Sequence, residues 1–330
     1  MRKLILLFAR QVAICQKQCL STTMLQFLLG ILIGSILGYF AAFKFDGENF
    51  TRIRKSSSIA TKQWKQSINL NPSTILSNIQ IQCIIFIHPN QLTKRKYVQS
   101  LRDTYTKQCN HTIYVTNSKK IVRYFAEELH VAFVNTRKTS YHWELYREII
   151  KYSTEYGKQQ QSFWTVISDE QTFIVMANLR RLLHALSDVK RPVILGRVSN
   201  KRNLLSYLFP WNSHSGILPQ AGIVFSRSAL EEMTSDKCVG WLSARATERA
   251  LIRCSNLVNV QIVDPTDKEG KHLFVPNGFE NLVAGNELKF STNVNERFFS
   301  HSDEAVSFGN LNYHDHQVLD FATTRIKVFG

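Results

Sequence analysis

The sequence lacks the features through which nucleic-acid-binding proteins use an excess of positive charge. Its 330 residues include 41 Lys and Arg against 25 Asp and Glu, which gives a formal net charge of +16. It has no long block of Lys and Arg, no RNA-binding signature and no zinc-finger spacing. We therefore expect no nucleic-acid partner, and we expect the charge to favour acidic membrane surfaces or anionic ligands.

The sequence also lacks the low hydrophobic content that is typical of disordered chains. Hydrophobic residues make up 44% of the sequence, which is enough for a sizeable core in one large domain or two ordinary ones. The part of the chain that follows its N-terminal segments is therefore expected to be globular.

Charge is absent from residues 25–43, which read LQFLLGILIGSILGYFAAF. This stretch meets the length that a helix needs to cross a bilayer. We expect an uncleaved signal anchor with residues 1–24 as a cytosolic tail, although Met24 offers an alternative start. A cleaved signal peptide is the competing interpretation, but the apolar run is longer than the apolar part of a typical signal peptide, and no small-residue cleavage site follows it.

Three glycines recur at every fourth residue of this segment. Gly30, Gly34 and Gly38 would lie on one helix face and let two copies of the helix approach closely. Homodimerisation through this face is one interpretation. Chance is an equal one, because glycine is common in membrane helices.

Cysteines and one sequon indicate which side of the membrane carries the folded domain, since positive charges flank the span on both sides. The spacing of the four cysteines after the span allows Cys83 to pair with Cys109 and Cys238 with Cys254, although it does not fix the connectivity. Disulfides indicate an oxidising lumen, and the glycosylation sequon at Asn110 agrees with a lumenal domain. We expect a single-pass type II protein of the endoplasmic reticulum or Golgi membrane, although no C-terminal ER-retrieval tetrapeptide is present.

Residues 44–78 are polar and show no sustained periodicity, so they are interpreted as a stem. Strands and helices then alternate through a lumenal domain at 79–330, which predicts an α/β sheet with ligands at the carboxyl ends of its strands. The expected strands are 79–87, 111–116, 163–167 and 192–195, and the expected helices are 94–108, 140–157 with Gly157 as the stop, and 176–186.

One expected strand ends in Asp169 and Glu170, followed by Gln171 where a third carboxylate would complete a cluster. Carboxylates released at a strand end can hold a divalent cation against a diphosphate, because hard cations prefer carboxylate oxygens. Gln171 supplies only a neutral carbonyl, so the pattern is that of a metal site that has lost a ligand. The alternative is that Asp169 and Glu170 are solvated acids at a strand end.

Other residues with functional potential have a simpler structural interpretation. His314 and His316 would form a replacement metal pair if they lay in a strand, but a surface loop is the favoured interpretation because two histidines alone seldom make a site. Trp143 and Trp164 are expected to be core anchors, with substrate stacking as the alternative.

Several motifs, taken together and in order, resemble the beta-1,3-glycosyltransferases of the core 1 galactosyltransferase group over about residues 79–330. The resemblance implies a GT-A-like, Rossmann-like glycosyltransferase domain on a type II membrane anchor. The matching segments are DTYTKQC at 103–109, DEQTFIVMANL at 169–179, AGIVFS at 221–226, FVP at 274–276 and the stretch from Ser307 to Phe321.

The departures from the family pattern concern its metal and its catalytic base. Active members hold manganese with the last Asp of the acidic cluster and with a terminal histidine, and these positions are Gln171 and Gly309 here. The position of the general base is Glu248. The chain is therefore most similar to the non-catalytic, Cosmc-type chaperone branch, which helps a core 1 galactosyltransferase client to fold. This similarity implies no metal, no catalytic residue, and a vestigial nucleotide-sugar site at 169–171 and Gly309.

Two other functions remain open. In an active N-acetylgalactosaminide beta-1,3-galactosyltransferase, Asp169 and Glu170 would hold Mn²⁺ against UDP-galactose, and Glu248 would deprotonate the hydroxyl of GalNAc-Ser/Thr. A structural or lectin-like module is the third possibility, because a fold does not fix a function.

Overall fold

The structure is a computed structural model that describes residues 24, 26–37, 79–89, 94–136, 142–160, 164–186, 191–201, 214–238, 247–277 and 302–324. The chain divides into two units, Met1–Asn49 with Arg202–Ser213, and Phe50–Lys201 with His214–Gly330. In the first unit, residues 26–37 are helical.

The expected membrane span at 25–43 is described only in part, and the expected stem at 44–78 lies outside the described residues. Among the residues that the structure describes, no helix combines the length and the apolarity needed to cross a bilayer. Gly30 and Gly34 have nothing within 4 Å of the position of an added Cβ, while Gly38 is not described. The glycine-mediated homodimer stays a prediction.

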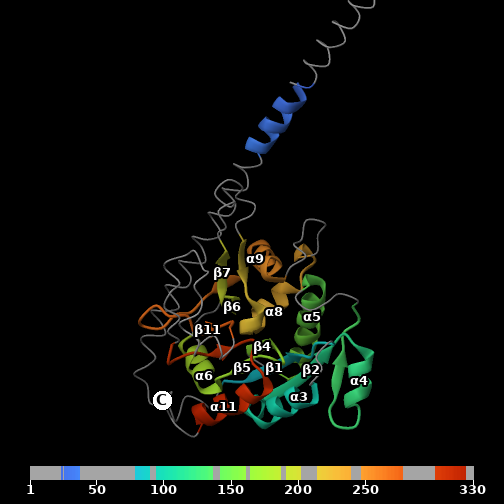
Figure 1. Ribbon diagram of the computed structural model, residues 1–330, viewed down its shortest axis with the longest axis vertical. Helices are drawn as coiled ribbons and strands as arrows, with labels where there is room; N and C mark the ends of the chain where they lie inside the picture. The colour runs from blue at the N-terminus through green and yellow to red at the C-terminus, as the bar shows by residue number, and fades with distance from the viewer. Residues whose placement is uncertain are drawn as a thin grey trace, which may run out of the picture. The chain divides into compact units, whose positions relative to one another are not determined.

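A mixed α/β fold forms the second unit, as the alternation of elements predicts (Figure 1). Its main sheet has the strand order β10-β6-β9-β4-β1-β2-β3. Every neighbouring pair is parallel except the two pairs that β9 makes with β4 and β6. The strands are β1 Ile81–Phe86, β2 His111–Thr116, β3 Val131–Phe133, β4 Trp164–Asp169, β6 Val193–Leu195, β9 Ile223–Ser226 and β10 Gln261–Val263.

Smaller sheets and helices surround the main sheet. Strand β12 (Ser307–Phe308) pairs with β11 (Phe274–Val275) and β5 (Phe173–Ile174), and β7 (Val198–Lys201) pairs with β8 (His214–Ile217). The α-helices of this unit are α3 Lys94–Asp103, α4 Lys119–Phe125, α5 Trp143–Gln160, α6 Met176–Ala185, α8 Arg227–Met233, α9 Thr247–Leu257 and α11 Tyr313–Thr324; the 3-10 helices are η1 Tyr105–Gln108, η3 Pro219–Ala221 and η4 Asp236–Cys238.

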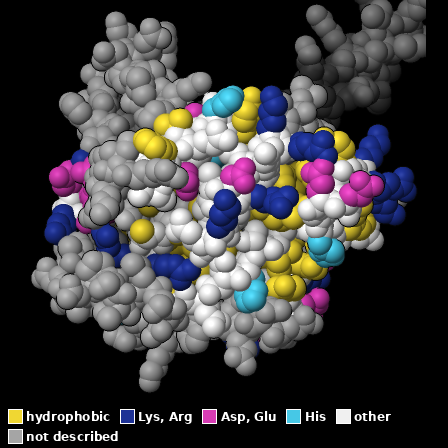
Figure 2. Space-filling model, turned by 90° about the horizontal axis from the view of Figure 1, so that it is seen from below, with side chains coloured by type: hydrophobic (Ala, Val, Ile, Leu, Met, Phe, Trp, Pro, Cys, Tyr) yellow, Lys and Arg dark blue, Asp and Glu magenta, His cyan; other side chains and the backbone are white. Residues whose placement is uncertain are grey.

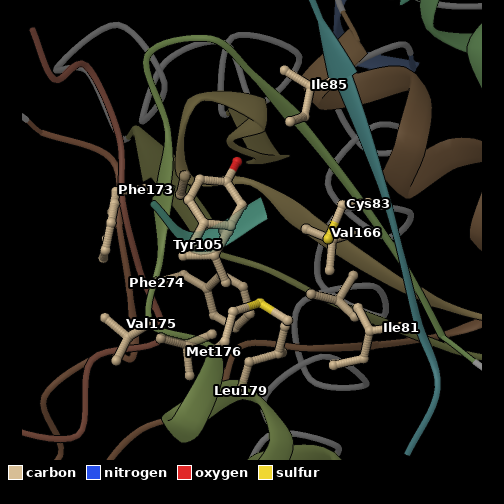
Figure 3. Packing of buried hydrophobic residues seen from close by; sticks show 14 of the residues in the cluster. Ile81, Cys83, Ile85, Tyr105, Val166, Phe173, Val175, Met176, Leu179 and Phe274 are labelled. Atoms are coloured by element: carbon tan, nitrogen blue, oxygen red, sulfur yellow. The ribbon is translucent and has the colours of Figure 1, made fainter. Parts of the chain in front are cut away.

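The core lies in two layers, one on each face of the sheet. Successive side chains of a strand point to opposite faces, so Cys83 and Ile85 of β1 belong to one cluster and Ile84 and Phe86 to the other. The first cluster is covered by α3, α4, α6 and α11, and Figure 3 shows part of it around Tyr105. The second is covered by α5, α8 and α9. Burial on both faces explains why all six residues of β1 are buried.

Two helices end differently from the sequence prediction. The helix expected at 94–108 is divided into α3 and η1, because the hydroxyls of Thr104 and Thr106 donate to the carbonyls of Ser100 and Leu101 at 2.9 and 2.7 Å and so take over the last acceptors of α3. Gly157 does not end α5, which runs to Gln160. A glycine inside a helix costs only about 1 kcal/mol.

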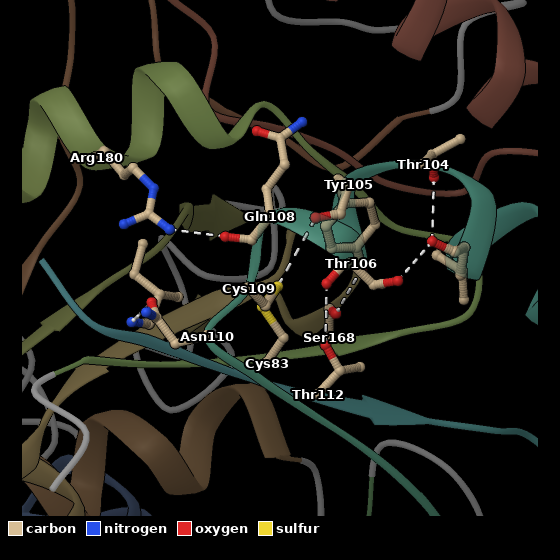
Figure 4. The surroundings of a disulfide bond; sticks show 12 residues. Cys83, Thr104, Tyr105, Thr106, Gln108, Cys109, Asn110, Thr112, Ser168 and Arg180 are labelled. Carbon is tan, nitrogen blue, oxygen red and sulfur yellow. Dashed lines mark hydrogen bonds between the residues drawn. A yellow bond between two sulfur atoms is a disulfide. The ribbon is translucent and has the colours of Figure 1, made fainter. Parts of the chain in front are cut away.

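Two disulfides are present, Cys83–Cys109 and Cys238–Cys254, with Cα–Cα distances of 6.0 and 4.9 Å. They confirm the pairing that the spacing allows. Figure 4 shows the first of them, which joins β1 to the residue before Asn110. Asn110 is exposed, and its Oδ1 accepts a hydrogen bond from the Ile81 N–H at 2.8 Å.

Candidate functional site

The acidic pair predicted from the sequence lies at the carboxyl end of β4, in the middle of the sheet. Asp169 is the last residue of β4 and is paired in register with Phe86 of β1. The neighbouring strand end therefore brings His88 to the acids. Asp169 is 5% exposed and Glu170 is 0% exposed, so the interpretation of these residues as solvated acids is wrong.

Asp169 uses its carboxylate to close the turn that follows β4. Its Oδ1 accepts hydrogen bonds from the Gln171 N–H at 3.1 Å and from the Thr172 hydroxyl at 2.8 Å. Its Oδ2 lies 3.6 Å from Nε2 of His88. A short polar side chain that bonds to the backbone two residues on is a common way to fix such a turn.

Glu170 is held by the same histidine through the backbone. Both of its carboxylate oxygens accept from the His88 N–H, at 3.2 and 3.1 Å. Burial raises the pKa of Glu170 to about 7, although the charge of the nearby His88 acts to lower it. Burial lowers the pKa of His88, but the hydrogen bond with Asp169 and the charges of both acids raise it above its usual value overall.

Gly309 lies where no side chain fits. A Cβ at this position would be 1.9 Å from the carbonyl oxygen of Gln220 and 3.1 Å from that of Pro276. The Gly309 N–H donates a hydrogen bond to the Val275 carbonyl at 2.8 Å. The Gln220 carbonyl accepts one from the Thr172 hydroxyl at 3.2 Å. The loop at Gln220 thus fills the space that a ligand side chain at 309 would need, so a histidine there would require the backbone to move.

Glu248 is not joined to the acidic pair by the contacts that the structure describes. It lies in the first turn of α9, where its Cβ would be 2.8 Å from a Cβ added at Gly216 of β8. Trp143 and Trp164 are 5% and 7% exposed, and the indole N–H of Trp143 donates to the Cys238 carbonyl at 3.3 Å. Both tryptophans are core anchors, as predicted.

The two terminal histidines do not form a pair. They lie in α11 and not in the expected surface loop, since Tyr313–Thr324 is helical. Residues two apart on a helix face different sides, so His314 is exposed while His316 is buried. Neither ring nitrogen of His316 has a hydrogen-bond partner in the described part of the chain, and burial lowers the pKa of this histidine to about 4.

The sequence analysis missed His88, His316 and Tyr146. A cavity of about 30 Å³, roughly the room for one water molecule, is lined by His88, Asp169 and Tyr146 among others. The Tyr146 hydroxyl is buried, with no hydrogen-bond partner in the described regions. The position of His88 directly after an expected buried strand could have marked it as a site residue. Among the described residues, no group of three or more His, Cys, Asp or Glu is arranged to hold a metal ion.

No known protein-family profile matches this chain. Among solved structures, 4-diphosphocytidyl-2C-methyl-D-erythritol synthase from Anaerococcus prevotii is 13% identical with a TM-score of 0.38, over 63% of this chain and 95% of that one. The mannosyltransferase PcManGT from Pyrobaculum calidifontis, in complex with GDP-Man and Mn²⁺, is 10% identical with a TM-score of 0.35, over 70% of this chain and 67% of that one. Scores this low do not bear on what this chain binds or does.

Proposed function

We propose that this chain is a non-catalytic, glycosyltransferase-like member of the core 1 beta-1,3-galactosyltransferase group. In this proposal a GT-A-like domain, anchored as a type II membrane protein in the endoplasmic reticulum or Golgi, helps a core 1 galactosyltransferase client to fold. The observation that carries the proposal is the closure of the backbone at Gly309, where a Cβ would be 1.9 Å from the Gln220 carbonyl oxygen.

The donor set argues against a resident divalent cation. Manganese would need several oxygen or nitrogen ligands in one place. Both carboxylate oxygens of Glu170 accept from the His88 N–H. Gln171 is an amide, and position 309 admits no side chain. Asp169 alone does not make a manganese site, and we derive no step through a metal.

A secretory compartment is supported by the two disulfides and by the exposed sequon at Asn110. Disulfides persist in oxidising compartments and are rare in the cytosol. The chaperone role itself rests on the family resemblance, because a folding helper needs a surface for its client and neither a metal nor a catalytic base.

The test combines two assays of the full-length chain. The first measures galactose transfer from UDP-galactose to a GalNAc-peptide in the presence of Mn²⁺, for wild type and for Gln171→Asp. We expect no turnover from either, since restoring one carboxylate leaves position 309 closed. The second co-expresses the chain with a core 1 galactosyltransferase and measures the activity of that enzyme, which we expect to rise.

The outcomes separate the candidate functions. Metal-dependent turnover by wild type would overturn the proposal in favour of an active transferase. Absence of turnover together with an unchanged client activity would instead leave a structural or lectin-like module.

An active transferase is favoured by one observation. A buried carboxyl with a pKa of about 7, beside a histidine and a small cavity at a strand end, is typical of catalytic sites. For that function Glu170→Gln should abolish turnover while Glu248→Gln, if Glu248 is the base, should do the same. Neither substitution should affect a chaperone assay beyond its effect on folding.

A further inference from the structure

A groove lies between α3 and α4 and is not lined by the acidic pair. Its volume is about 520 Å³. Its floor is apolar, because Val98 and Phe125 are 3% and 1% exposed and belong to the core, and Leu129 packs against the same cluster. The lining residues are Arg95, Val98, Gln99, Arg102, Asp103, Phe125, Glu128 and Leu129.

The rim of the groove carries two arginines, Arg95 and Arg102, and two acids, Asp103 and Glu128. Arg95 pairs with Glu128 and lies over the ring of Tyr124, 5.8 Å from its centroid. Arg102 is exposed. Asp103, the other acid of the lining, lies 4.0 Å from Lys107, which offsets its charge. Both acids of the rim are thus already matched by a cation.

The segment that forms the groove is basic as a whole. Residues 94–128 contain eight Lys and Arg against three Asp and Glu. Figure 2 views the molecule from below, the side on which α3 lies in Figure 1, and shows Lys and Arg side chains, with Asp and Glu side chains among them, next to exposed hydrophobic surface. Such a field raises the local concentration and the association rate of a partner with negative charge.

We propose that this groove docks a segment of another protein in which acidic residues flank one large apolar side chain. The apolar side chain would enter between Val98, Phe125 and Leu129, and a carboxylate would meet the exposed Arg102. A buried apolar anchor within a polar rim is the usual energetic plan of a protein–protein contact. Arg is well suited to the rim, because its guanidinium binds a carboxylate through two parallel hydrogen bonds.

The identity of the partner rests on the proposed function, in which the segment would belong to the client. The docking itself does not. A groove of this chemistry would bind an acidic segment whether the chain is a chaperone, an enzyme or a lectin-like module.

The test measures fluorescence anisotropy of short labelled peptides with the full-length protein. The probe places one Leu among Glu and Ser residues, and two control peptides replace Glu by Lys or Leu by Ser. We expect binding of the probe alone, and weaker binding as ionic strength rises. Arg102→Glu should weaken the affinity about tenfold or more. Gln99→Trp, which places a bulky ring at the exposed rim, should weaken it without changing the charge.

Arg227→Glu is the matched control. Arg227 is exposed on α8, where it pairs with Glu231, and its substitution changes the net charge as Arg102→Glu does. Equal loss of affinity in the two variants would overturn the proposal, because net charge and not the groove would then govern binding. Equal binding of the Glu and Lys peptides, or no effect of Gln99→Trp, would overturn it too. A client-rescue assay can fail while this binding persists, so the two proposals fail separately.

Discussion

The two ends of β1 and β4 differ in the kind of polar group that they bury. At the amino end, Arg180 donates to the carbonyls of Ile79 and Gln108, and Asn110 accepts from the backbone of β1. Nε2 of the buried Gln82 has no hydrogen-bond partner among the described residues, so an unsatisfied group occurs at this end too. At the carboxyl end, two acids are buried beside His88, and the polar atoms of Tyr146 and His316 have no hydrogen-bond partner among the described residues. Buried polar groups without partners are costly.

The carboxyl end thus differs from the amino end in burying ionisable groups, namely Asp169, Glu170 and His316. Clusters of buried ionisable groups with displaced pKa values are concentrated at functional sites. The carboxyl edge of such a sheet is also where α/β proteins bind ligands. Substitutions at the two ends should therefore have effects of different kinds and of different size.

The largest effect is expected at the amino end, from removal of the Cys83–Cys109 disulfide. The bond joins residues 26 apart in sequence, and a closed loop of that length stabilises by about 3 to 4 kcal/mol in the chain-entropy model. The double variant Cys83→Ala with Cys109→Ala should lose this stability in denaturant unfolding. Reduction of the wild type serves as a second route, and an unchanged midpoint in both would contradict the prediction.

At the carboxyl end, Gly309→Ala should cost about 3 kcal/mol, because the new methyl group overlaps the Gln220 carbonyl and the loop must shift. Thermal unfolding measures the loss. Gly30→Ala is the control, since nothing lies within 4 Å of a Cβ there. Equal stability of Gly309→Ala and wild type would remove the main support for a closed metal position.

The buried titratable groups of the carboxyl end should give opposite pH dependences that offset one another. The pKa of Glu170 is raised from 4.5 to about 7, so its stabilising contribution is present below pH 4.5 and is lost as the pH rises through 7. The pKa of His316 is lowered from 6.5 to about 4, so its contribution is present above pH 6.5 and is lost as the pH falls through 4. Between pH 4.5 and 6.5 the two slopes largely cancel.

Single substitutions should expose each slope. Glu170→Gln should make the protein lose about 2 to 3 kcal/mol of stability on acidification from pH 6.5 to 4, whereas His316→Phe should make it gain a similar amount from pH 7 to 4.5. Denaturant unfolding at a series of pH values measures both. Parallel pH profiles of the two variants would show that these groups do not titrate as their burial requires.

The smallest effect is expected from Asn110→Ala, which removes an acceptor for the Ile81 N–H and should cost about 1 kcal/mol. Thr112→Ala destroys the same sequon but keeps the hydrogen bond of Asn110. Both variants should lose a glycan in secretory-pathway expression, as seen by gel mobility with and without glycosidase. A mobility shift as large as that of the wild type in either variant would contradict glycosylation at Asn110, since the second sequon, at Asn49, can account only for a smaller shift.

Sequence patterns predicted the strands β1, β2, β4 and β6, because these are local hydrophobic runs, but not the short strands β3 and β10 or the order of the strands in the sheet. The strand His111–Thr116 has the predicted bounds, and the strand that releases Asp169 was found from its apolar run. The ends of helices were harder. Side-chain hydroxyls of Thr104 and Thr106 end α3 through bonds to its last carbonyls, and periodicity does not record such bonds.

By itself, the sequence determined the α/β alternation, a cysteine spacing that allows two local pairs, and the weakness of the acidic cluster, since each depends on residue type and spacing along the chain. Only the tertiary structure decided what these residues meet. It brought His88 to the acids across parallel strands, buried His316 and exposed His314 on one helix, and closed position 309 with a carbonyl 89 residues earlier in the chain. The physical reason is that burial and pKa depend on neighbours distant in sequence.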